Sequence, residues 1–193
     1  MLKRVCVFCG SSDGARSSYR EAAAMLGRVL GARRIGVVYG GGNIGLMGAL
    51  ADAALGAGGE VIGVIPEHLV NKELAHRGVD LRIVHSMHER KALMADLADA
   101  FIALPGGYGT LEEFCEVLTW SQLGLHAKPC GLLNVDGYYD SLLGLFDHAV
   151  AEGFVRPPSR DIVLVDDQAA RLLDRLALWQ APQVERWIDR DER

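Results

Sequence analysis

Length, composition and charge limit what this chain can be. Its 193 residues suffice for one α/β domain with a full core and are too few for two ordinary domains, so we expect a single domain over 1–193. Half of the residues are apolar, the formal net charge is −5 and no basic block occurs, which argues against nucleic acid or a membrane surface as partner. No apolar run suits a signal peptide or a membrane span, so we expect a cytoplasmic protein that acts on a small molecule.

The pattern of apolar runs and breakers predicts strands that alternate with helices. We expect strands at 5–8, 34–39, 61–65, 81–84, 100–104, 130–133 and 161–165, and helices over about 18–30, from Gly45 to Gly56–Gly59, from Met87 through Leu97, and over 111–123, 138–152 and 167–179. Residues 66–80 read as a long loop, and we expect a polar tail from about 181 with Trp187 as its only large apolar anchor. The alternation predicts an α/β fold, a Rossmann-like doubly wound parallel sheet of about seven strands with helices on both faces.

The first β-α unit carries two short motifs. Ser18-x-x-Glu21 fits a capping box for its helix. Cys6-x-x-Cys9 has the spacing of a redox or zinc pair, but residues three apart in a strand point to opposite faces, and there is no second cysteine pair. We therefore expect no metal or redox use of these cysteines.

A first glycine motif, Gly40-Gly41-Gly42-Asn43-Ile44-Gly45, follows the second strand. Its spacing matches G-x-G-x-x-G, but a dinucleotide site needs the motif after the first strand and an acid at the end of the next, whereas Glu60 precedes its strand. We favour a tight turn with close helix packing, in which the backbone can still approach a nucleotide.

Arg90 stands where the apolar stripe of Leu93, Met94 and Leu97 continues into the first turn of the helix that opens at Met87. A cation there costs stability unless an anion faces it, so Arg90 is either an anion-binding residue or part of a structural salt bridge. His85 and His88 have no convincing metal partners and read as loop and helix-start residues.

A second glycine motif, Leu104-Pro105-Gly106-Gly107-Tyr108-Gly109-Thr110-Leu111-Glu112-Glu113, joins a buried strand to an amphipathic helix. We expect its glycines to turn through positive φ and bring backbone amides to the positive end of the helix dipole, a corner that favours phosphate. Glu112 and Glu113 should lie in the first helical turn. The alternative is a capping box from Thr110 to Glu113.

These motifs all follow strands, and in a parallel sheet the carboxyl ends of the strands share one edge. Gly10–Ser12, Gly40–Gly45, Arg90–Lys91 and Gly106–Glu113 should therefore meet there, which suits a nucleotide. A carboxylate near cations should stay ionised, and Glu113 would then stabilise the positive charge that develops on ribose when its glycosidic bond breaks.

The same residues carry a family resemblance. Pro105-Gly-Gly-Tyr-Gly-Thr-Leu-Glu-Glu113, Met87-His-Glu-Arg-Lys91, Tyr39-Gly-Gly-Gly-Asn43 and Cys9-Gly-Ser-Ser12 resemble the LONELY GUY family of cytokinin riboside 5′-monophosphate phosphoribohydrolases, often labelled lysine decarboxylases. The resemblance covers about 5–154. It implies a Rossmann-like homodimer, without cofactor or metal, that hydrolyses the N-glycosidic bond of AMP or N6-prenyl-AMP to free base and ribose 5-phosphate.

The resemblance also assigns residues. It implies Arg90 and Glu113 as the catalytic pair. For substrate binding, the motifs and the resemblance together indicate Ser12, Gly42, Asn43, Glu73, Met87, Lys91, Gly106, Gly107, Tyr108, Gly109, Thr110, Leu111, Glu112 and Thr119. The match of Glu73 requires a one-residue gap in its loop. Two alternatives remain: a molybdenum-cofactor carrier, which would hold a phosphorylated pterin without cleaving it, and a general purine 5′-monophosphate nucleosidase.

Overall fold

The computed structural model describes residues 2–70 and 74–181, which form one seven-stranded sheet in the order β4-β3-β2-β1-β5-β6-β7 with every pair parallel. The strands are β1 Arg4–Phe8, β2 Gly36–Tyr39, β3 Val61–Pro66, β4 Asp80–Val84, β5 Ala100–Ala103, β6 Cys130–Leu133 and β7 Val163–Asp166. The helices are α1 Ser17–Ala32, α2 Gly45–Gly56, α3 Met87–Leu97, α4 Tyr108–Gln122, α5 Asp140–Ala151, α6 Pro157–Arg160 and α7 Ala169–Leu178, with the 3₁₀ turns η1 Glu67–Leu69 and η2 Val135–Gly137. The predicted Rossmann-like parallel sheet is confirmed.

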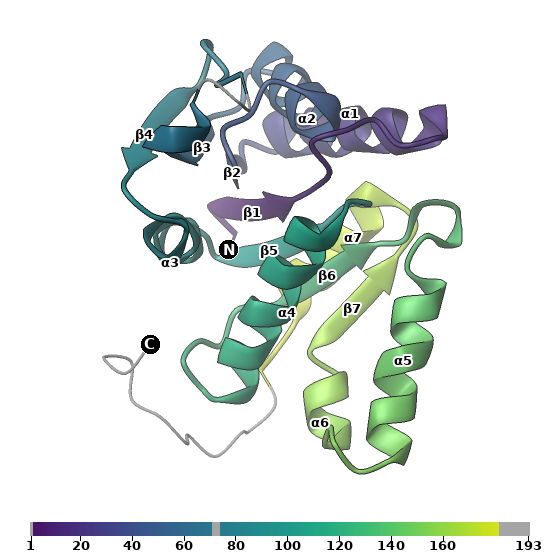
Figure 1. Cartoon of the computed structure of the whole chain (residues 1–193). Coiled ribbons are helices and arrows are strands. Elements are labelled where there is room, and N and C mark those ends of the chain that lie inside the picture. The colour runs from purple at the N-terminus through teal and green to yellow at the C-terminus, as the bar shows by residue number, and fades with distance from the viewer. Residues whose placement is uncertain (1, 71–73, 182–193) are drawn as a thin grey trace.

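Helices cover both faces of the sheet, as predicted. Leu26 of α1, Leu50 of α2 and Leu172 of α7 belong to one buried cluster, on the face reached by Val5 and Val7 of β1. Met94 of α3 and Phe114 of α4 belong to a second cluster on the opposite face, against which apolar residues of α5 pack. Figure 1 shows α1 and α2 on one side of β1, and α3 and α4 on the other.

The middle strand β1 separates two halves of the chain. It pairs with β2 on one edge and with β5 on the other, with Val5 opposite Ala100. Beyond the strands, the Leu104 N–H donates to the Phe8 carbonyl at 2.9 Å, and the Gly10 N–H donates to the Pro105 carbonyl at 3.0 Å. The loops after β1 and β5 are thus held together at the point where the strand order reverses, which is where α/β sheets bind their ligands.

Several predicted boundaries were wrong. The second strand begins at Gly36 rather than at position 34, because Arg34 takes a left-handed conformation with φ 56° after α1. The helix expected from 138 begins at Asp140, after the 3₁₀ turn η2. The last strand starts at Val163 rather than 161, because the unpredicted helix α6 precedes it.

The predicted capping box of the first helix was also wrong. The helix begins at Ser17 with Arg16 as N-cap, and no side-chain hydrogen bond caps it. The sequence contained a different capping box, Ser86-x-x-Glu89, at the start of α3. There the Glu89 N–H donates to the Ser86 hydroxyl at 3.1 Å, and the Glu89 carboxylate accepts from the His85 N–H at 2.8 Å.

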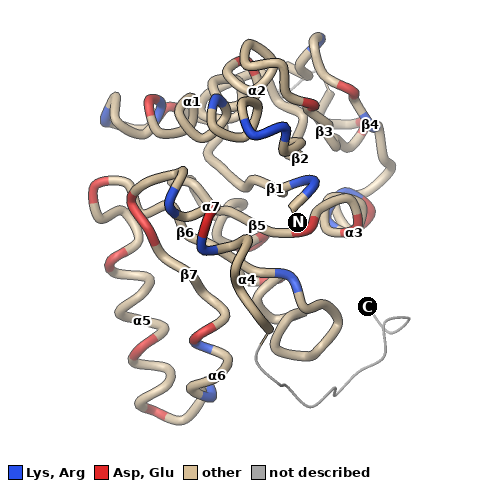
Figure 2. The backbone as a smooth tube through the Cα atoms, turned by 180° about the vertical axis from the view of Figure 1, so that it is seen from behind, with Lys and Arg blue, Asp and Glu red and all other residues tan. Residues whose placement is uncertain are grey.

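The cysteine pair is split as expected, since Cys6 belongs to one core cluster and Cys9 packs against the other. Figure 2 shows acidic and basic residues interspersed along the chain. Within 2–70 and 74–181, no helix is both long and apolar enough to cross a membrane. The prediction for Trp187 lies outside the described residues.

Candidate active site

A cavity of about 330 Å³ lies at the carboxyl edge of the sheet, between the end of β1 and the starts of α3 and α4. It is lined by the end of β1 and the turn after it, by Gly40 and Met47, by the first turn of α3 and by the start of α4. Eight of the predicted site residues line it: Met87, Arg90, Gly107, Tyr108, Gly109, Thr110, Glu112 and Glu113. The sheet therefore brings together the segments that the sequence placed at one edge.

Arg90 is buried, with 6% of its surface exposed, and its guanidinium is held by backbone oxygens. Its Nε donates to the Val64 carbonyl at 3.1 Å and its Nη2 to the Gly40 carbonyl at 3.0 Å. Gly40 leaves the space that Arg90 fills, since a Cβ at this position would overlap Nη2. The backbone of β3 and the residue that follows β2 thus fix the direction of the cation at the cavity wall.

Glu113 lines the same cavity from α4 and is half-buried. The helix begins at Tyr108 with Gly107 as N-cap and has no side-chain cap and no acidic residue in its first turn. The capping box from Thr110 to Glu113 is therefore wrong, and so is the placement of Glu112 and Glu113 in the first turn. The helix starts three residues earlier than expected, which moves both carboxylates to the second turn.

The glycines of the second motif are explained by the space around them and not by a positive φ. Gly107 has φ −90°, and neither Gly106 nor Gly109 is among the positive-φ residues, so the predicted left-handed turn was wrong. A Cβ on Gly106 would overlap Thr110, whereas a Cβ on Gly107 or Gly109 would meet nothing within 4 Å. Gly107 and Gly109 therefore leave open room beside the start of α4. Positive φ occurs in the first motif instead, at Gly41 and Gly45.

Two tyrosines that the sequence analysis did not single out hold the loop after β5. The Tyr139 hydroxyl donates to the Leu104 carbonyl at 2.6 Å, and the Tyr138 hydroxyl donates to the Gly106 carbonyl at 2.5 Å. These bonds turn the carbonyls of the loop toward α5. No local signal could have found them, because the contact spans more than thirty positions of the sequence.

Lys91, one position after Arg90, does not line the cavity. Its Nζ donates to Glu112 Oε1 at 2.5 Å and to Glu116 Oε1 at 3.0 Å, which links α3 to α4. Burial by itself would lower the pKa of Lys91, but the hydrogen bonds to the two glutamates outweigh it and raise the pKa. Lys91 therefore stays an ammonium ion next to the cavity.

Cys9 also lines the cavity, but its thiol is a poor nucleophile. Burial, and then the negative charge of Glu113, raise the pKa of Cys9 well above its ordinary value. The pKa of Cys6 is raised by burial and by Glu113 as well, and is lowered in part by Arg90. The charged groups that line the cavity are thus Arg90, Glu112 and Glu113, and not a thiolate.

A second hollow of about 240 Å³ adjoins the cavity on the other side of the loop after β5 and contains the predicted Ser12 and Gly106. It shares Gly10 and Gly107 with the cavity, and its wall includes Tyr19 and Tyr138, whose rings meet edge to face at 5.6 Å. Ser12 thus lies beside the main cavity rather than in it.

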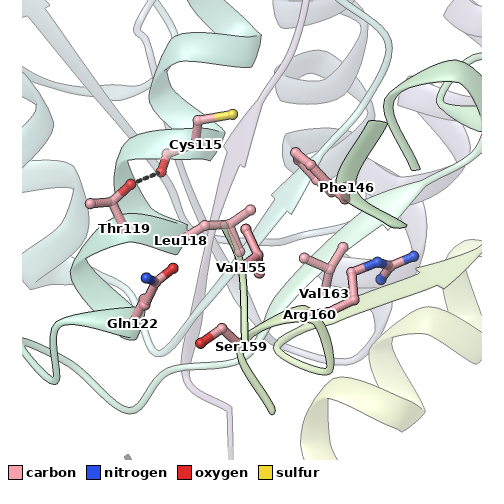
Figure 3. Close-up of a pocket in the computed structure, with 9 residues that line it drawn as sticks. All are labelled: Cys115, Leu118, Thr119, Gln122, Phe146, Val155, Ser159, Arg160 and Val163. Carbon is pink, nitrogen blue, oxygen red and sulfur yellow. Dashed lines mark hydrogen bonds between the residues drawn. The ribbon is translucent and has the colours of Figure 1, made fainter. Parts of the chain in front are cut away.

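Four predicted residues lie elsewhere, and one cannot be placed. Gly42 forms an antiparallel bridge with Ala75, and Asn43 donates from its N–H to the Leu74 carbonyl, so both anchor the loop after η1. Leu111 packs against the core. Thr119 lines a separate pocket of about 180 Å³ between α4, α5 and β7, where its hydroxyl donates to the Cys115 carbonyl at 2.8 Å (Figure 3). Glu73 lies outside the described residues.

Comparison with known proteins gives a consistent result. Residues 47–176 match the family model described as "Possible lysine decarboxylase". A probable cytokinin riboside 5′-monophosphate phosphoribohydrolase of Oryza sativa subsp. japonica is 58% identical over 176 residues, which cover 91% of this chain and 78% of the relative. A cytokinin riboside 5′-monophosphate phosphoribohydrolase of Arabidopsis thaliana is 56% identical over 176 residues, covering 91% of this chain and 82% of the relative.

Solved structures of lower identity share the fold. The molybdenum cofactor binding protein from Rippkaea orientalis superposes with a TM-score of 0.69 at 22% identity, covering 92% of this chain and 96% of that protein. The molybdenum cofactor carrier protein from Chlamydomonas reinhardtii gives a TM-score of 0.67 at 19% identity, covering 93% and 100%. At these identities the likeness concerns the fold alone.

Proposed function

The chain belongs to the family of cytokinin riboside 5′-monophosphate phosphoribohydrolases, and we propose that it hydrolyses the N-glycosidic bond of AMP or of an N6-modified AMP in the cavity between the end of β1 and the starts of α3 and α4. Water adds across the bond between the base nitrogen and C1′ of ribose. The base leaves with a proton, and ribose 5-phosphate gains the hydroxyl group. The observation that carries the proposal is the presence of Arg90 and Glu113 in one cavity with the open start of α4.

The 5′-phosphate would bind at the start of α4. The first turn of a helix has amides without partners inside the helix and carries the positive end of the dipole. Gly107 and Gly109 leave open space at this turn, so the substrate can come close to those amides. Binding energy gained at the phosphate, away from the bond that breaks, would hold the ribose in place for reaction.

The ribose would lie toward Glu113. Breaking the glycosidic bond places positive charge on the sugar ring, and an ionised carboxylate beside the ring stabilises that charge. Arg90 would orient the anionic substrate, because its guanidinium is fixed by the Val64 and Gly40 carbonyls. Catalysis would then be mainly electrostatic, with both charges preorganised before substrate arrives.

The family model is described as a possible lysine decarboxylase, but Lys91 does not have the property that a Schiff-base lysine would need. A lysine that forms a Schiff base needs a lowered pKa so that its amine is neutral, whereas the two glutamates raise the pKa of Lys91.

We also propose that the protein is a homodimer and that α5 belongs to the contact. In α5 no residue is buried, although much of its sequence is apolar. Leu145 is 59% exposed, and Phe154, just beyond the helix, is 83% exposed. A second copy would cover this surface, as symmetric dimers commonly do. Thr119 lies near α5, in the pocket shown in Figure 3.

One assay tests the function. The purified protein is incubated with AMP, GMP, N6-isopentenyl-AMP and adenosine, and released base is measured by chromatography. We expect release from AMP or its N6-prenyl form and a kcat/KM for adenosine at least about 100-fold lower, because the nucleoside lacks the phosphate contacts.

The other outcomes identify the alternatives. Equal cleavage of AMP and GMP would indicate a general purine 5′-monophosphate nucleosidase. Binding without base release from any nucleotide would favour the carrier. Comparable kcat/KM values for adenosine and AMP would contradict the phosphate site at α4. The cytoplasmic location stays a prediction, for cell fractionation to test.

A further inference from the structure

Lys91 and two glutamates form a charged bridge between α3 and α4 beside the cavity. The Lys91 ammonium lies 2.5 Å from Glu112 Oε1 and 3.0 Å from Glu116 Oε1. The three side chains differ in exposure, at 10% for Lys91, 25% for Glu116 and 53% for Glu112. The bridge is therefore closed on the side of Glu116 and open to solvent on the side of Glu112.

The two glutamates also differ in what they face. Glu112 lines the cavity, whereas Glu116 does not. The second carboxylate oxygen of Glu116, Oε2, is buried and has no hydrogen-bond partner among the described residues. A buried acceptor without a partner destabilises the fold, so Glu116 calls for an explanation beyond folding.

The spacing of the two glutamates supplies the explanation. Residues four apart lie on the same face of a helix, and like charges at that spacing repel. Lys91 bridges Glu112 and Glu116, which offsets the repulsion and holds Glu112 by its Oε1 while this side chain lines the cavity. Glu116, the less exposed of the two glutamates, holds Lys91 from the buried side. The Lys91 ammonium is thereby kept from moving toward solvent together with Glu112.

We propose that Glu116 is a positioning residue of the nucleotide site: it holds Lys91, and Lys91 in turn fixes the Glu112 carboxylate at the cavity wall, where that carboxylate accepts a hydrogen bond from a ribose hydroxyl. The proposal rests on the phosphoribohydrolase function and assigns the carboxylate side of the cavity to the sugar.

Electrostatics decides which part of the substrate meets Glu112. A phosphate offers no proton at neutral pH and is repelled by a carboxylate, whereas a ribose hydroxyl donates a hydrogen bond to one. The phosphate thus belongs at the start of α4 and the ribose one turn further along the helix. Lys91, which is already paired twice, supports Glu112 instead of binding the phosphate.

The test replaces Glu116 by glutamine, which keeps the shape of the side chain and removes its charge. We expect KM for AMP to rise about 5- to 10-fold in Glu116→Gln while kcat changes less than about twofold, since a charge-assisted hydrogen bond acting through Lys91 is weakened. The variant should also lose part of the discrimination between AMP and its 2′-deoxy and 3′-deoxy forms in KM. Glu21→Gln, an exposed change on α1 that removes the same charge, should leave KM unaltered.

A double-mutant cycle separates positioning from independent effects. If Glu116 acts through Lys91, the variant Lys91→Gln with Glu116→Gln should have the KM of Lys91→Gln alone. Additive losses would overturn the proposal. So would a lower melting temperature of Glu116→Gln with unchanged KM, because that result indicates a purely structural role.

A measurement without turnover distinguishes this proposal from the function on which it rests. NMR titration of lysines labelled at Cε should show a lower pKa for Lys91 in Glu116→Gln than in the wild type, because one of its two carboxylate partners is lost. Absence of base release by the wild type would refute the proposed function. An unchanged Lys91 titration would refute the role of Glu116 even if the wild type is active.

Discussion

Replacing Glu113 with glutamine separates chemistry from folding. The structure has no capping role for this side chain, because Gly107 caps α4 without side-chain help. Loss of one preorganised charge should lower kcat for AMP by roughly 100-fold or more. The melting temperature of Glu113→Gln should stay within about 2 °C of the wild-type value, since an isosteric change at a half-buried side chain alters stability little.

Kinetics and thermal unfolding of the same preparation check this prediction. Glu21→Gln, an exposed change on α1, is the control for loss of one carboxylate. A loss of less than threefold in kcat, with the melting temperature intact, would remove Glu113 from the mechanism.

Gly109 and Gly106 should respond in opposite ways to alanine. A Cβ on Gly109 meets open space in the first turn of α4, where alanine favours the helix, so Gly109→Ala should keep or raise the melting temperature. The same Cβ takes room beside the phosphate amides, and KM for AMP should rise about 10-fold. Gly106→Ala should lower the melting temperature, because its Cβ overlaps Thr110.

Gly56→Ala is the matched control, since Gly56 ends α2 and a Cβ added there would meet nothing within 4 Å. It should change neither KM nor kcat. A Gly109→Ala enzyme with wild-type KM would show that no substrate group approaches this turn.

At the scale of elements, Asp166 joins the end of β7 to α7. Its carboxylate accepts from Arg171 Nε at 2.8 Å and from the Gln168 N–H at 2.9 Å. The hydrogen bond from Arg171, followed by that from Gln168, overcomes the opposing effect of burial and lowers the pKa of Asp166. Because the pKa is lower in the folded state, the stabilisation is present above the unfolded value of about 4 and is lost as pH falls through the folded value.

Asp166→Asn should therefore lower the free energy of unfolding by about 2 kcal/mol at pH 7 and by much less below the folded pKa of Asp166. Urea unfolding across this pH range measures the difference. An equal difference at every pH would mean that packing, rather than charge, explains the loss.

The element scale also shows how far the sequence alone could go. The strand runs and their alternation with helices predicted the sheet, because buried parallel strands read as short apolar runs. Helix starts were the weak point. Ser18 and Thr110 fit the capping pattern of the sequence as well as Ser86 does. Only Ser86 is an N-cap residue whose side chain accepts a hydrogen bond, because α1 and α4 begin before Ser18 and Thr110.

The site was predictable in its position more than in its detail. Parallel topology alone predicts that Arg90 and Glu113 reach one edge of the sheet. The contacts of Tyr138 and Tyr139 with the glycine loop, and the anchoring of Lys91 by Glu116, depend on segments far apart in sequence. Thr119 was assigned to the substrate site by the family resemblance. It lines another pocket, because it lies further along α4 than the residues that line the cavity.

For the whole molecule, the exposed apolar surface of α5 predicts association. Light scattering at micromolar concentration should give twice the mass of the chain, and Leu145→Glu should shift the mass toward a monomer, because a charge in an apolar contact is costly. Leu178→Glu, a change at an exposed leucine of α7, should leave the mass unchanged. A monomeric wild type would contradict the homodimer.

The central position of β1 also has a consequence for how the chain matures during synthesis. The strand pairs with β2 early, but its other edge must wait for β5, which begins 95 positions after Val5 at Ala100. Until then a nascent chain presents the unpaired edge of a strand that is apolar from Val5 to Phe8, the kind of surface that recruits other strands and chaperones. The start of α4, which lines the cavity, comes after β5 in the chain, so a chain halted before β5 has a vulnerable edge and no site.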